Sequence, residues 1–182
     1  MHIIGIAGTI GAGKGTVVDY LKERGFAHHS SSGLLKEILI EQSTPVDRDA
    51  LAALAREIRA KDQDGVLKLT YERAKHDQPE KVILESIHTV GEADFVRSVG
   101  GKILGVDADV AVRYERISKR GSEKDNVSYE KFLEQAKRED DGTEKSGHNI
   151  RGVIQTADAV VMNNGTLEEL HRAIDSTLEK LL

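Results

Sequence analysis

Residues 8–16 read Gly-Thr-Ile-Gly-Ala-Gly-Lys-Gly-Thr, and this stretch decides the fold. The apolar run Ile-Ile-Gly-Ile-Ala at 3–7 precedes it, and a helical pattern follows at 16–24. Glycines let a backbone wrap so that several N–H groups point at one anion, and the following helix adds its positive N-terminal end. Lys14 can then reach the β- and γ-phosphates as a point charge. The stretch therefore predicts a phosphate-binding loop that takes a nucleoside triphosphate.

We expect the triphosphate to contact this loop along its length, at Gly8, Gly11, Ala12, Gly13, Lys14, Gly15 and Thr16. In the common pattern, Ser or Thr directly follows the lysine, and its hydroxyl binds Mg²⁺. Here Gly15 occupies that position, and the hydroxyl comes one residue later, at Thr16. Thr16 is therefore the candidate Mg²⁺ ligand of the loop.

Composition limits the class of protein. A chain of 182 residues is about one domain, 1–182, with room for a small insert. Hydrophobic residues make up 38% of the chain and aromatic residues only 4%, so the core must be aliphatic. The net charge of −5, with basic residues scattered along helices, argues against a nucleic-acid polymer as partner. The absence of cysteine excludes disulfides, thiolate catalysis and a Cys-based zinc site.

The apolar runs are short. None approaches the ~20 residues that a membrane-spanning helix needs, so we expect no membrane partner. The strand pattern begins at residue 2, so we expect no signal peptide and a cytoplasmic location. The sequence leaves monomer and homodimer open.

Strand and helix patterns alternate along the chain. Strands are expected at 2–7, 81–86, 102–106 and 159–162, with a further short strand near 26–28. Helical patterns lie between and after them, at 16–24, 34–41, 48–76, 93–98, 109–119, 128–138, 150–156 and 167–181. This alternation predicts βαβ units and an α/β fold whose parallel sheet of about five strands is covered on both faces.

Two polar segments stand apart from this pattern. The stretch 43–76 is mostly helical and contains arginines, and 121–149 is highly charged with loops at both ends. Long inserts in a compact α/β domain are often binding elements or lids, which a phosphoryl-transfer enzyme needs to exclude water. We therefore expect an acceptor-binding region at about 30–76 and a lid at about 121–149.

Phosphoryl transfer needs cations around the transferred group and a carboxylate near the metal. Glu85 follows an apolar strand, and ligands of open α/β sheets lie at the carboxyl ends of strands. Glu85 is thus expected to hold Mg²⁺ through water or to orient an acceptor hydroxyl; an exposed strand-end glutamate is the structural alternative.

Arginines on the expected helix at 109–119 are the candidate cations. Arg113, Arg116 and Arg120 share one helix face, just before the charged segment. We expect Arg120 first and Arg116 second to stabilise charge in the transition state, with Arg138 supplied from the lid; a solvated basic face is the alternative.

The acceptor candidates carry weaker patterns. Ser32 is a helix cap or a ligand, Arg56 and Arg59 bind an acceptor phosphate or solvate their helix, and Asn164 forms a turn or contacts the nucleotide base. Thr166 and Glu169 form a capping box of purely structural role. His28 and His29 are expected to be ordinary surface or strand-edge residues.

The order of these motifs resembles that of P-loop nucleoside monophosphate kinases over nearly the whole chain. The loop ending Gly-Lys-Gly-Thr resembles that of adenylate kinases, and the tail at 157–170 looks most like dephospho-CoA kinases and archaeal adenylate-kinase-related proteins. The resemblance implies the three-layer P-loop NTPase fold, with a helical acceptor-binding insert and a lid. It also implies Mg²⁺ as cofactor and ATP as phosphoryl donor.

The acceptor side departs from both groups. Adenylate kinases carry Asp-Gly-Phe-Pro-Arg after the corresponding strand, whereas residues 85–88 here read Glu-Ser-Ile-His. The Asp-x-Asp of dephospho-CoA kinases is absent as well. His88 is therefore a candidate acceptor-phosphate ligand, which binds weakly at neutral pH unless a phosphate raises its pKa.

The leading hypothesis is a kinase that moves the γ-phosphoryl group of ATP to a small nucleotide-like acceptor, with a nucleoside or deoxynucleoside monophosphate as first candidate. Phosphorylation of a hydroxyl, in dephospho-CoA or a nucleoside, is the enzymatic alternative. A nucleotide-dependent ATPase switch is the alternative from another class.

Overall fold

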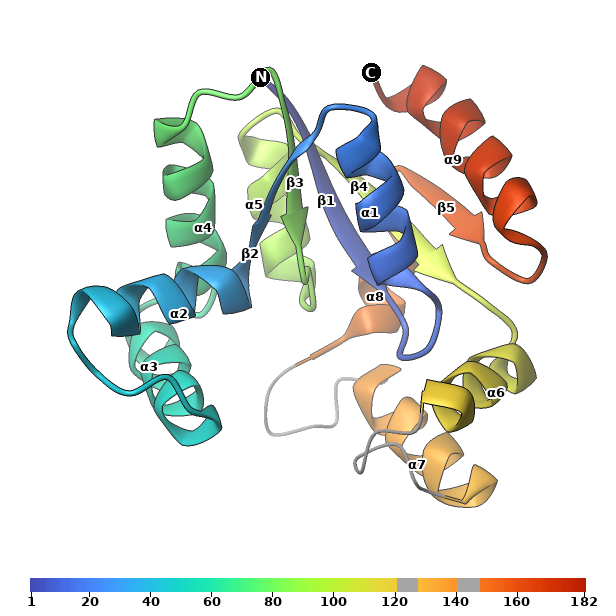
Figure 1. Ribbon diagram of the computed structural model, residues 1–182, viewed down its shortest axis with the longest axis horizontal. Helices are drawn as coiled ribbons and strands as arrows, with labels where there is room; N and C mark the ends of the chain where they lie inside the picture. The colour runs from blue at the N-terminus through green and yellow to red at the C-terminus, as the bar shows by residue number, and fades with distance from the viewer. Residues whose placement is uncertain (121–127, 141–147) are drawn as a thin grey trace.

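The computed structural model describes residues 1–120, 128–140 and 148–182, and within these only the backbone of residues 48 and 138–140. The described residues form one parallel sheet of five strands in the order β2-β3-β1-β4-β5 (Figure 1). The strands are β1 (His2–Gly8), β2 (Ala27–Ser30), β3 (Lys81–Glu85), β4 (Lys102–Asp107) and β5 (Ala159–Met162). The predicted α/β sheet is confirmed, with the short strand displaced to 27–30.

Helices connect the strands in the order that the sequence predicts. They are α1 (Lys14–Glu23), α2 (Ser31–Glu41), α3 (Arg48–Lys61), α4 (Gly65–His76), α5 (Val90–Ser98), α6 (Val110–Arg120), α7 (Tyr129–Asp140), α8 (Ile150–Gln155) and α9 (Leu167–Leu181). Among the described residues, no helix is both long and apolar enough to cross a lipid bilayer.

Alternation along the strands divides the core into two layers. Ile4, Ile6 and Ile83 point to the face that α1 and α9 cover. Val82 and Leu84 point to the other face, which α4, α5 and α8 cover. Because both faces are covered, each central strand is a nearly continuous apolar run, as expected of a buried parallel strand.

The single helix predicted at 48–76 is wrong, because the chain breaks between α3 and α4. Asp62 leaves the helical region, at φ −151° and ψ 117°, and its carboxylate accepts hydrogen bonds from the Asp64 N–H at 3.1 Å and from Lys68 Nζ at 2.6 Å. A short acidic side chain that binds the following backbone competes with helix continuation. The break folds α4 back onto the sheet and leaves α2 and α3 to project from it.

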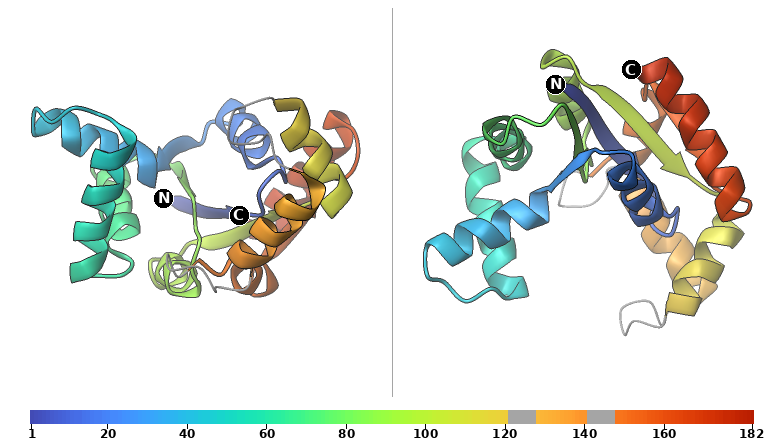
Figure 2. Two further views of the ribbon diagram at one scale, coloured as in Figure 1. Left: turned by 90° about the horizontal axis from the view of Figure 1, so that it is seen from below. Right: turned by 45° about the horizontal axis from the view of Figure 1, so that its top comes forward.

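Two small clusters extend from this body. Leu35, Ala55 and Val66 join α2, α3 and α4 at one side. Ile117 and Phe132 join α6 to α7 at the other, and Figure 2 shows α2–α3 and α6–α7 on opposite sides of the sheet. Much of the lid predicted at about 121–149 lies outside the described residues, which here comprise 128–140 and 148–149.

Candidate functional site

The phosphate-binding loop joins β1 to α1 with a backbone that favours glycine. Gly11 has φ +79° and Gly13 φ +93°, in the left-handed region that side chains with a Cβ rarely enter. Gly13 is also the N-cap of α1, and it supplies no side chain to bind the first N–H groups of the helix. Backbone donors at a helix N-terminus therefore face the loop interior, which is the arrangement that binds phosphate.

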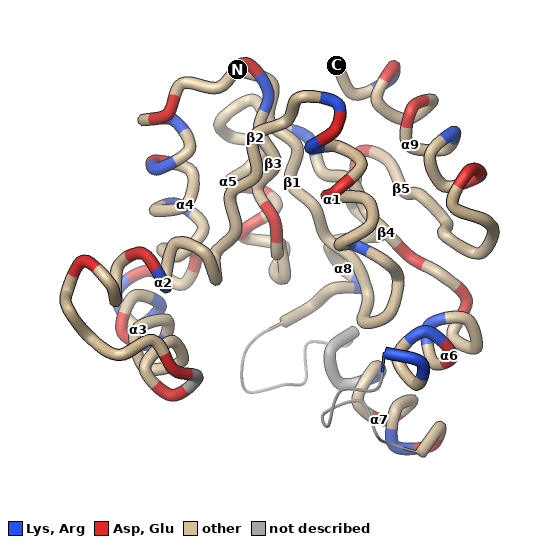
Figure 3. The backbone as a smooth tube through the Cα atoms, in the orientation of Figure 1, with Lys and Arg blue, Asp and Glu red and all other residues tan. Residues whose placement is uncertain are grey.

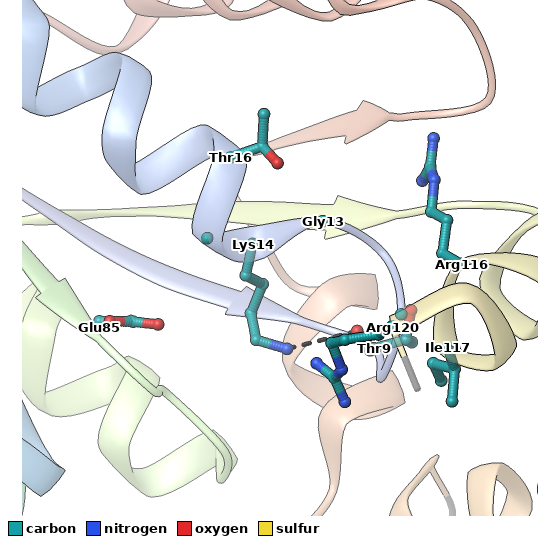
Figure 4. Close-up of a pocket in the computed structure, with 10 residues that line it drawn as sticks. Thr9, Gly13, Lys14, Thr16, Glu85, Arg116, Ile117 and Arg120 are labelled. Atoms are coloured by element: carbon teal, nitrogen blue, oxygen red, sulfur yellow. Dashed lines mark hydrogen bonds between the residues drawn. The ribbon is translucent and has the colours of Figure 1, made fainter. Parts of the chain in front are cut away.

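Lys14 lies across this loop. Its Nζ donates to the carbonyl oxygens of Gly8 at 2.7 Å and Thr9 at 3.3 Å. Figure 4 shows its side chain between Glu85 and Arg120. An ammonium group held at this point by two carbonyls is ready to meet an anion at the mouth of the loop.

One cavity of about 420 Å³ brings the predicted donor-side residues together. Its lining consists of Thr9, Gly11, Gly13, Lys14, Gly15, Thr16, Glu85, Arg116, Ile117 and Arg120. These residues come from the loop, from the end of β3 and from α6, more than 30 residues apart in the sequence. Figure 3 shows the basic stretch of α6 beside the turn that joins β1 to α1. The lining therefore presents cations from two elements, Lys14 of the loop and Arg116 and Arg120 of α6, to one space.

The three arginines of α6 have different environments. Arg113 is buried, with 5% of its surface exposed, and its Nη1 lies 3.5 Å from the carbonyl oxygen of Ile10. Its Nε lies 4.0 Å from a carboxylate oxygen of Asp107 and donates no hydrogen bond within the described part of the chain. Arg113 therefore supports the loop from behind and is absent from the cavity lining.

Arg116 and Arg120 line the cavity. Arg116 donates from Nη2 to Asn163 Oδ1 at 3.3 Å, and its buried Nη1 has no hydrogen-bond partner among residues 1–120, 128–140 and 148–182. A buried guanidinium donor of this kind is expected to find its acceptor on a ligand. Arg120 is more exposed, at the end of the helix. The side chain of Arg138 lies outside the described residues.

Asn163 is a residue of the site that the sequence analysis did not identify. It is buried, and its Nδ2 donates to the carbonyl oxygen of Ala12 at 2.8 Å while its Oδ1 receives Arg116. It thus connects the end of β5 to the loop and to α6. No local pattern signals such a contact, because the two ends lie 151 residues apart.

The neighbouring polar residues have local partners. Asn164 lies outside the cavity lining, and its Oδ1 accepts from the N–H of Asp109, just before α6. Its predicted base contact stays a prediction. Thr166 and Glu169 form the predicted capping box at the start of α9.

Glu85 ends β3 and faces the cavity. Its Oε2 lies 2.7 Å from Nε2 of His28, on the adjacent strand β2. This hydrogen bond is the main cause of a lowered pKa of Glu85, and the positive charge of Lys14 adds to it against the effect of burial. Glu85 is therefore a carboxylate at neutral pH. His28 lies on the edge strand β2, as the sequence suggested, and it is also the hydrogen-bond partner of Glu85.

His88 has a different environment from the one its sequence position suggested. Burial, followed by the positive charges of His148, Lys14 and Arg59, lowers the pKa of His88 to about 3. Its ring lies 4.5 Å from that of His148, measured between centroids. His88 is absent from the cavity lining and is neutral at physiological pH, so only a bound anion that raises its pKa would charge it.

The other acceptor candidates lie on the helices of the insert. Ser30, not Ser32, caps α2, by accepting from the N–H of Gly33 at 3.0 Å; Ser32 is exposed. Arg56 is exposed and donates from Nε to the carbonyl oxygen of Ala52 in its own helix. Arg59 is half-buried and close enough to affect the pKa of His88. Of these candidates, Arg59 has the clearest relation to the end of β3.

Comparison with known proteins agrees with this geometry. The family model AAA_18, described as "AAA domain", matches residues 4–142. A UPF0200 protein of Sulfurisphaera tokodaii is 30% identical over 184 residues, which cover 100% of this chain and 98% of that protein. A UPF0200 protein of Methanococcus vannielii is 27% identical over 186 residues, covering 100% and 97%.

Solved structures share the fold. TT1252 from Thermus thermophilus has a TM-score of 0.64 at 24% identity, covering 99% of this chain and 97% of that one. The shikimate kinase of Aquifex aeolicus has a TM-score of 0.58 at 16% identity, covering 99% and 97%. The dephospho-CoA kinase of Campylobacter jejuni has a TM-score of 0.56 at 14% identity, covering 98% and 96%. The sheet order, the glycine loop and these likenesses confirm the predicted P-loop NTPase fold of the kinase type. The chain belongs to the AAA_18 family of AAA domains, a kinase-like P-loop family, and it is also a member of the UPF0200 family of its relatives.

Proposed function

We propose that this protein transfers the γ-phosphoryl group of ATP to a small nucleotide-like acceptor, with a nucleoside or deoxynucleoside monophosphate as first candidate. The observation that carries the proposal is the single cavity lined by Lys14, Arg116, Arg120 and Glu85 beside the N-terminus of α1. Phosphoryl transfer requires charge stabilisation and positioning more than covalent chemistry, and this lining offers both.

Each donor-side residue has a role that its position supports. The N–H groups of the loop and the start of α1 hold the phosphates of ATP, and Lys14 neutralises charge on the β- and γ-phosphates. Arg116 and Arg120 approach from α6 and stabilise the charge that spreads over the transferred group. Arg116 is held for this role by Asn163, so less of its side-chain freedom is lost when the nucleotide binds.

The lining also fits Mg²⁺. Thr16 and Glu85 offer a hydroxyl and a carboxylate on the same cavity, and Mg²⁺ prefers oxygen ligands of this kind. The described residues hold no cluster of three or more His, Asp or Glu side chains suited to a metal. That fits an ion that keeps several waters and binds chiefly through substrate phosphates. When bound, Mg²⁺ would neutralise charge on the phosphates; Thr16 and, through water, Glu85 would hold it.

Charge on the insert supports a phosphate-bearing acceptor. Arg59 of α3 reaches the neighbourhood of His88 and Glu92, at the end of β3, where its charge affects the pKa of both groups. An acceptor phosphate placed between Arg59 and the cavity would meet a cation on the insert and Lys14 on the loop. The acceptor-binding region at about 30–76 is therefore proposed to contribute Arg59 first, with Arg56 and Ser32 at its exposed rim.

A hydroxyl acceptor is the second candidate, and one observation favours it. Glu85 is ionised, faces the cavity and is hydrogen-bonded on one oxygen by His28. A carboxylate in this position can orient a hydroxyl by accepting its proton in a hydrogen bond. A monophosphate acceptor needs no such group, because its attacking oxygen is already ionised.

The test is an ATP-consumption screen across nucleosides, the common nucleoside and deoxynucleoside monophosphates, and dephospho-CoA. We expect slow ATP loss without an acceptor and a large increase with one monophosphate or a closely related group of them. Acceleration by a nucleoside or dephospho-CoA alone would establish the second candidate. ATP loss that no small acceptor accelerates would contradict the proposal and favour an ATPase switch. The Lys14→Ala variant is the blank for contaminating kinases.

A further inference from the structure

The pair formed by His28 and Glu85 is built by the register of two neighbouring strands. In the parallel pairing of β2 with β3, His28 lies opposite Ile83 and Ser30 lies opposite Glu85. His28 and Glu85 therefore project from the same face of the sheet, one diagonal step apart. Their side chains meet at 2.7 Å between Nε2 and Oε2. Both are largely shielded, with 27% and 24% of the side-chain surface exposed.

The two members of the pair face different spaces. Glu85 lines the cavity of the phosphate-binding loop, and His28 does not. His28 lines a second cavity of about 220 Å³, between β2, α2 and α4. His28 therefore lies behind Glu85 as seen from Lys14. Oε1 of Glu85 accepts no hydrogen bond from the part of the chain that the structure describes, so one carboxylate oxygen is held from behind and the other remains for a ligand.

We propose that His28 is a positioning residue for phosphoryl transfer. It fixes the Glu85 carboxylate so that the second carboxylate oxygen, Oε1, serves the acceptor or a bound water molecule. This inference rests on the proposed function, because it assigns Glu85 a task in the same cavity. A glutamate side chain has three rotatable bonds and loses much rotamer freedom when it is ordered. A hydrogen bond made before the substrate arrives removes that cost from the reaction, and small misplacements of reacting groups cost up to about 100-fold in rate.

His29 provides the matched control within the same strand. It follows His28 directly, so its side chain points to the opposite face of the sheet. Its Nε2 lies 3.6 Å from a carboxylate oxygen of Asp77, and 16% of its side-chain surface is exposed. A substitution of His29 therefore removes a more shielded imidazole from β2, which also lines the second cavity, without touching Glu85 or the loop cavity.

The kinetic experiment compares His28→Leu, His28→Gln and His29→Leu with the wild type, using ATP and the acceptor found in the screen. We expect His28→Leu to lower kcat about tenfold or more, with the KM for ATP changed less than about twofold. His28→Gln keeps an N–H donor and should recover a large part of the loss, whereas His29→Leu should stay within about twofold of wild type. Melting temperatures establish that all variants fold.

A second measurement does not depend on activity. In protein labelled with ¹³C at glutamate carboxyl carbons, the Glu85 resonance is assigned by its loss in Glu85→Gln. We expect this resonance to move at pH 7 in His28→Leu and to stay in place in His29→Leu. An unmoved resonance, an unchanged kcat in His28→Leu, or a Gln variant as slow as the Leu variant would overturn the role of His28. Absence of acceptor-dependent turnover in the wild type would instead overturn the proposed function, and the resonance would still decide whether His28 holds Glu85.

Discussion

The donor side and the acceptor side of the cleft are held together in different ways. On the donor side, hydrogen bonds join distant parts of the chain: Asn163 to Ala12 and Thr9 to Asp107. On the acceptor side, α2 and α3 project from the sheet on a small apolar cluster with α4, and Arg56 bonds within its own helix. The donor side is thus pre-organised, as electrostatic catalysis with the proposed triphosphate requires. The acceptor side has the sparse packing from which moving elements of enzymes are drawn.

The largest effect is expected from removing the Lys14 ammonium group from the donor side. Lys14→Ala should lower turnover by at least about 100-fold, because charge on the transferred group loses its nearest ammonium. Unfolding free energy should change by only about 1 kcal/mol, since Lys14 contributes two hydrogen bonds to loop carbonyls. Lys22→Ala, an exposed lysine of the same helix paired with Asp19, is the control and should leave turnover unchanged. Normal turnover in Lys14→Ala would sink the assignment of the loop.

Two arginines of α6 are expected to have different roles on the donor side, one in catalysis and one in stabilising the fold. Arg116→Ala should lower kcat about 10- to 100-fold with a small change in melting temperature, because Arg116 lines the cavity. Arg113→Ala should instead lower the unfolding free energy by about 2–4 kcal/mol, because it removes a buried guanidinium beside Asp107 and Ile10. Urea denaturation and steady-state kinetics on both variants test this division. Loss of kcat in Arg113→Ala together with loss of stability in Arg116→Ala would contradict the roles assigned to the two arginines.

Asn163 tests whether the donor side depends on its long-range bonds. Asn163→Ala should lower kcat/KM for ATP about tenfold and stability by about 1–2 kcal/mol, since both the Ala12 carbonyl and Arg116 lose a partner. Asn164→Ala removes a bond to the backbone of Asp109 outside the cavity and should have a smaller effect on kcat/KM. Equal effects of the two variants on kcat/KM would contradict a specific role of Asn163 in the site.

The smallest expected effect concerns the pH dependence at His88, next to the acceptor side. The pKa of His88 is about 3 in the folded protein, below its ordinary value of 6.5. Between these values the unfolded chain binds a proton that the folded protein does not, so stability falls as pH drops through 6.5. The wild type should therefore lose about 1–2 kcal/mol more than His88→Gln between pH 7 and pH 5 in urea denaturation. Parallel pH profiles would contradict the burial of a neutral imidazole.

The sequence predicted what local patterns encode. The glycines of residues 8–16 favour the positive φ angles that the loop requires, and buried strands such as 81–85 are apolar runs. Both were therefore predicted correctly. The break at Asp62 was missed because residues 48–76 contain no proline. The helix ends instead where the Asp62 side chain accepts a hydrogen bond from the backbone N–H of Asp64. The spacing of the α6 arginines, at 113, 116 and 120, puts all three on one helix face and could not show which one is buried. The partnership of His28 with Glu85 depends on strand register, which no single segment contains.

We propose that the donor side delivers phosphoryl groups to a small molecule rather than to water. The most direct measurement follows the γ-phosphorus of ATP by ³¹P NMR, with the best acceptor of the screen and without it. We expect a new acceptor-bound phosphoryl resonance that grows as ATP disappears, and little inorganic phosphate in either sample. Inorganic phosphate released at the same rate with and without the acceptor would contradict it.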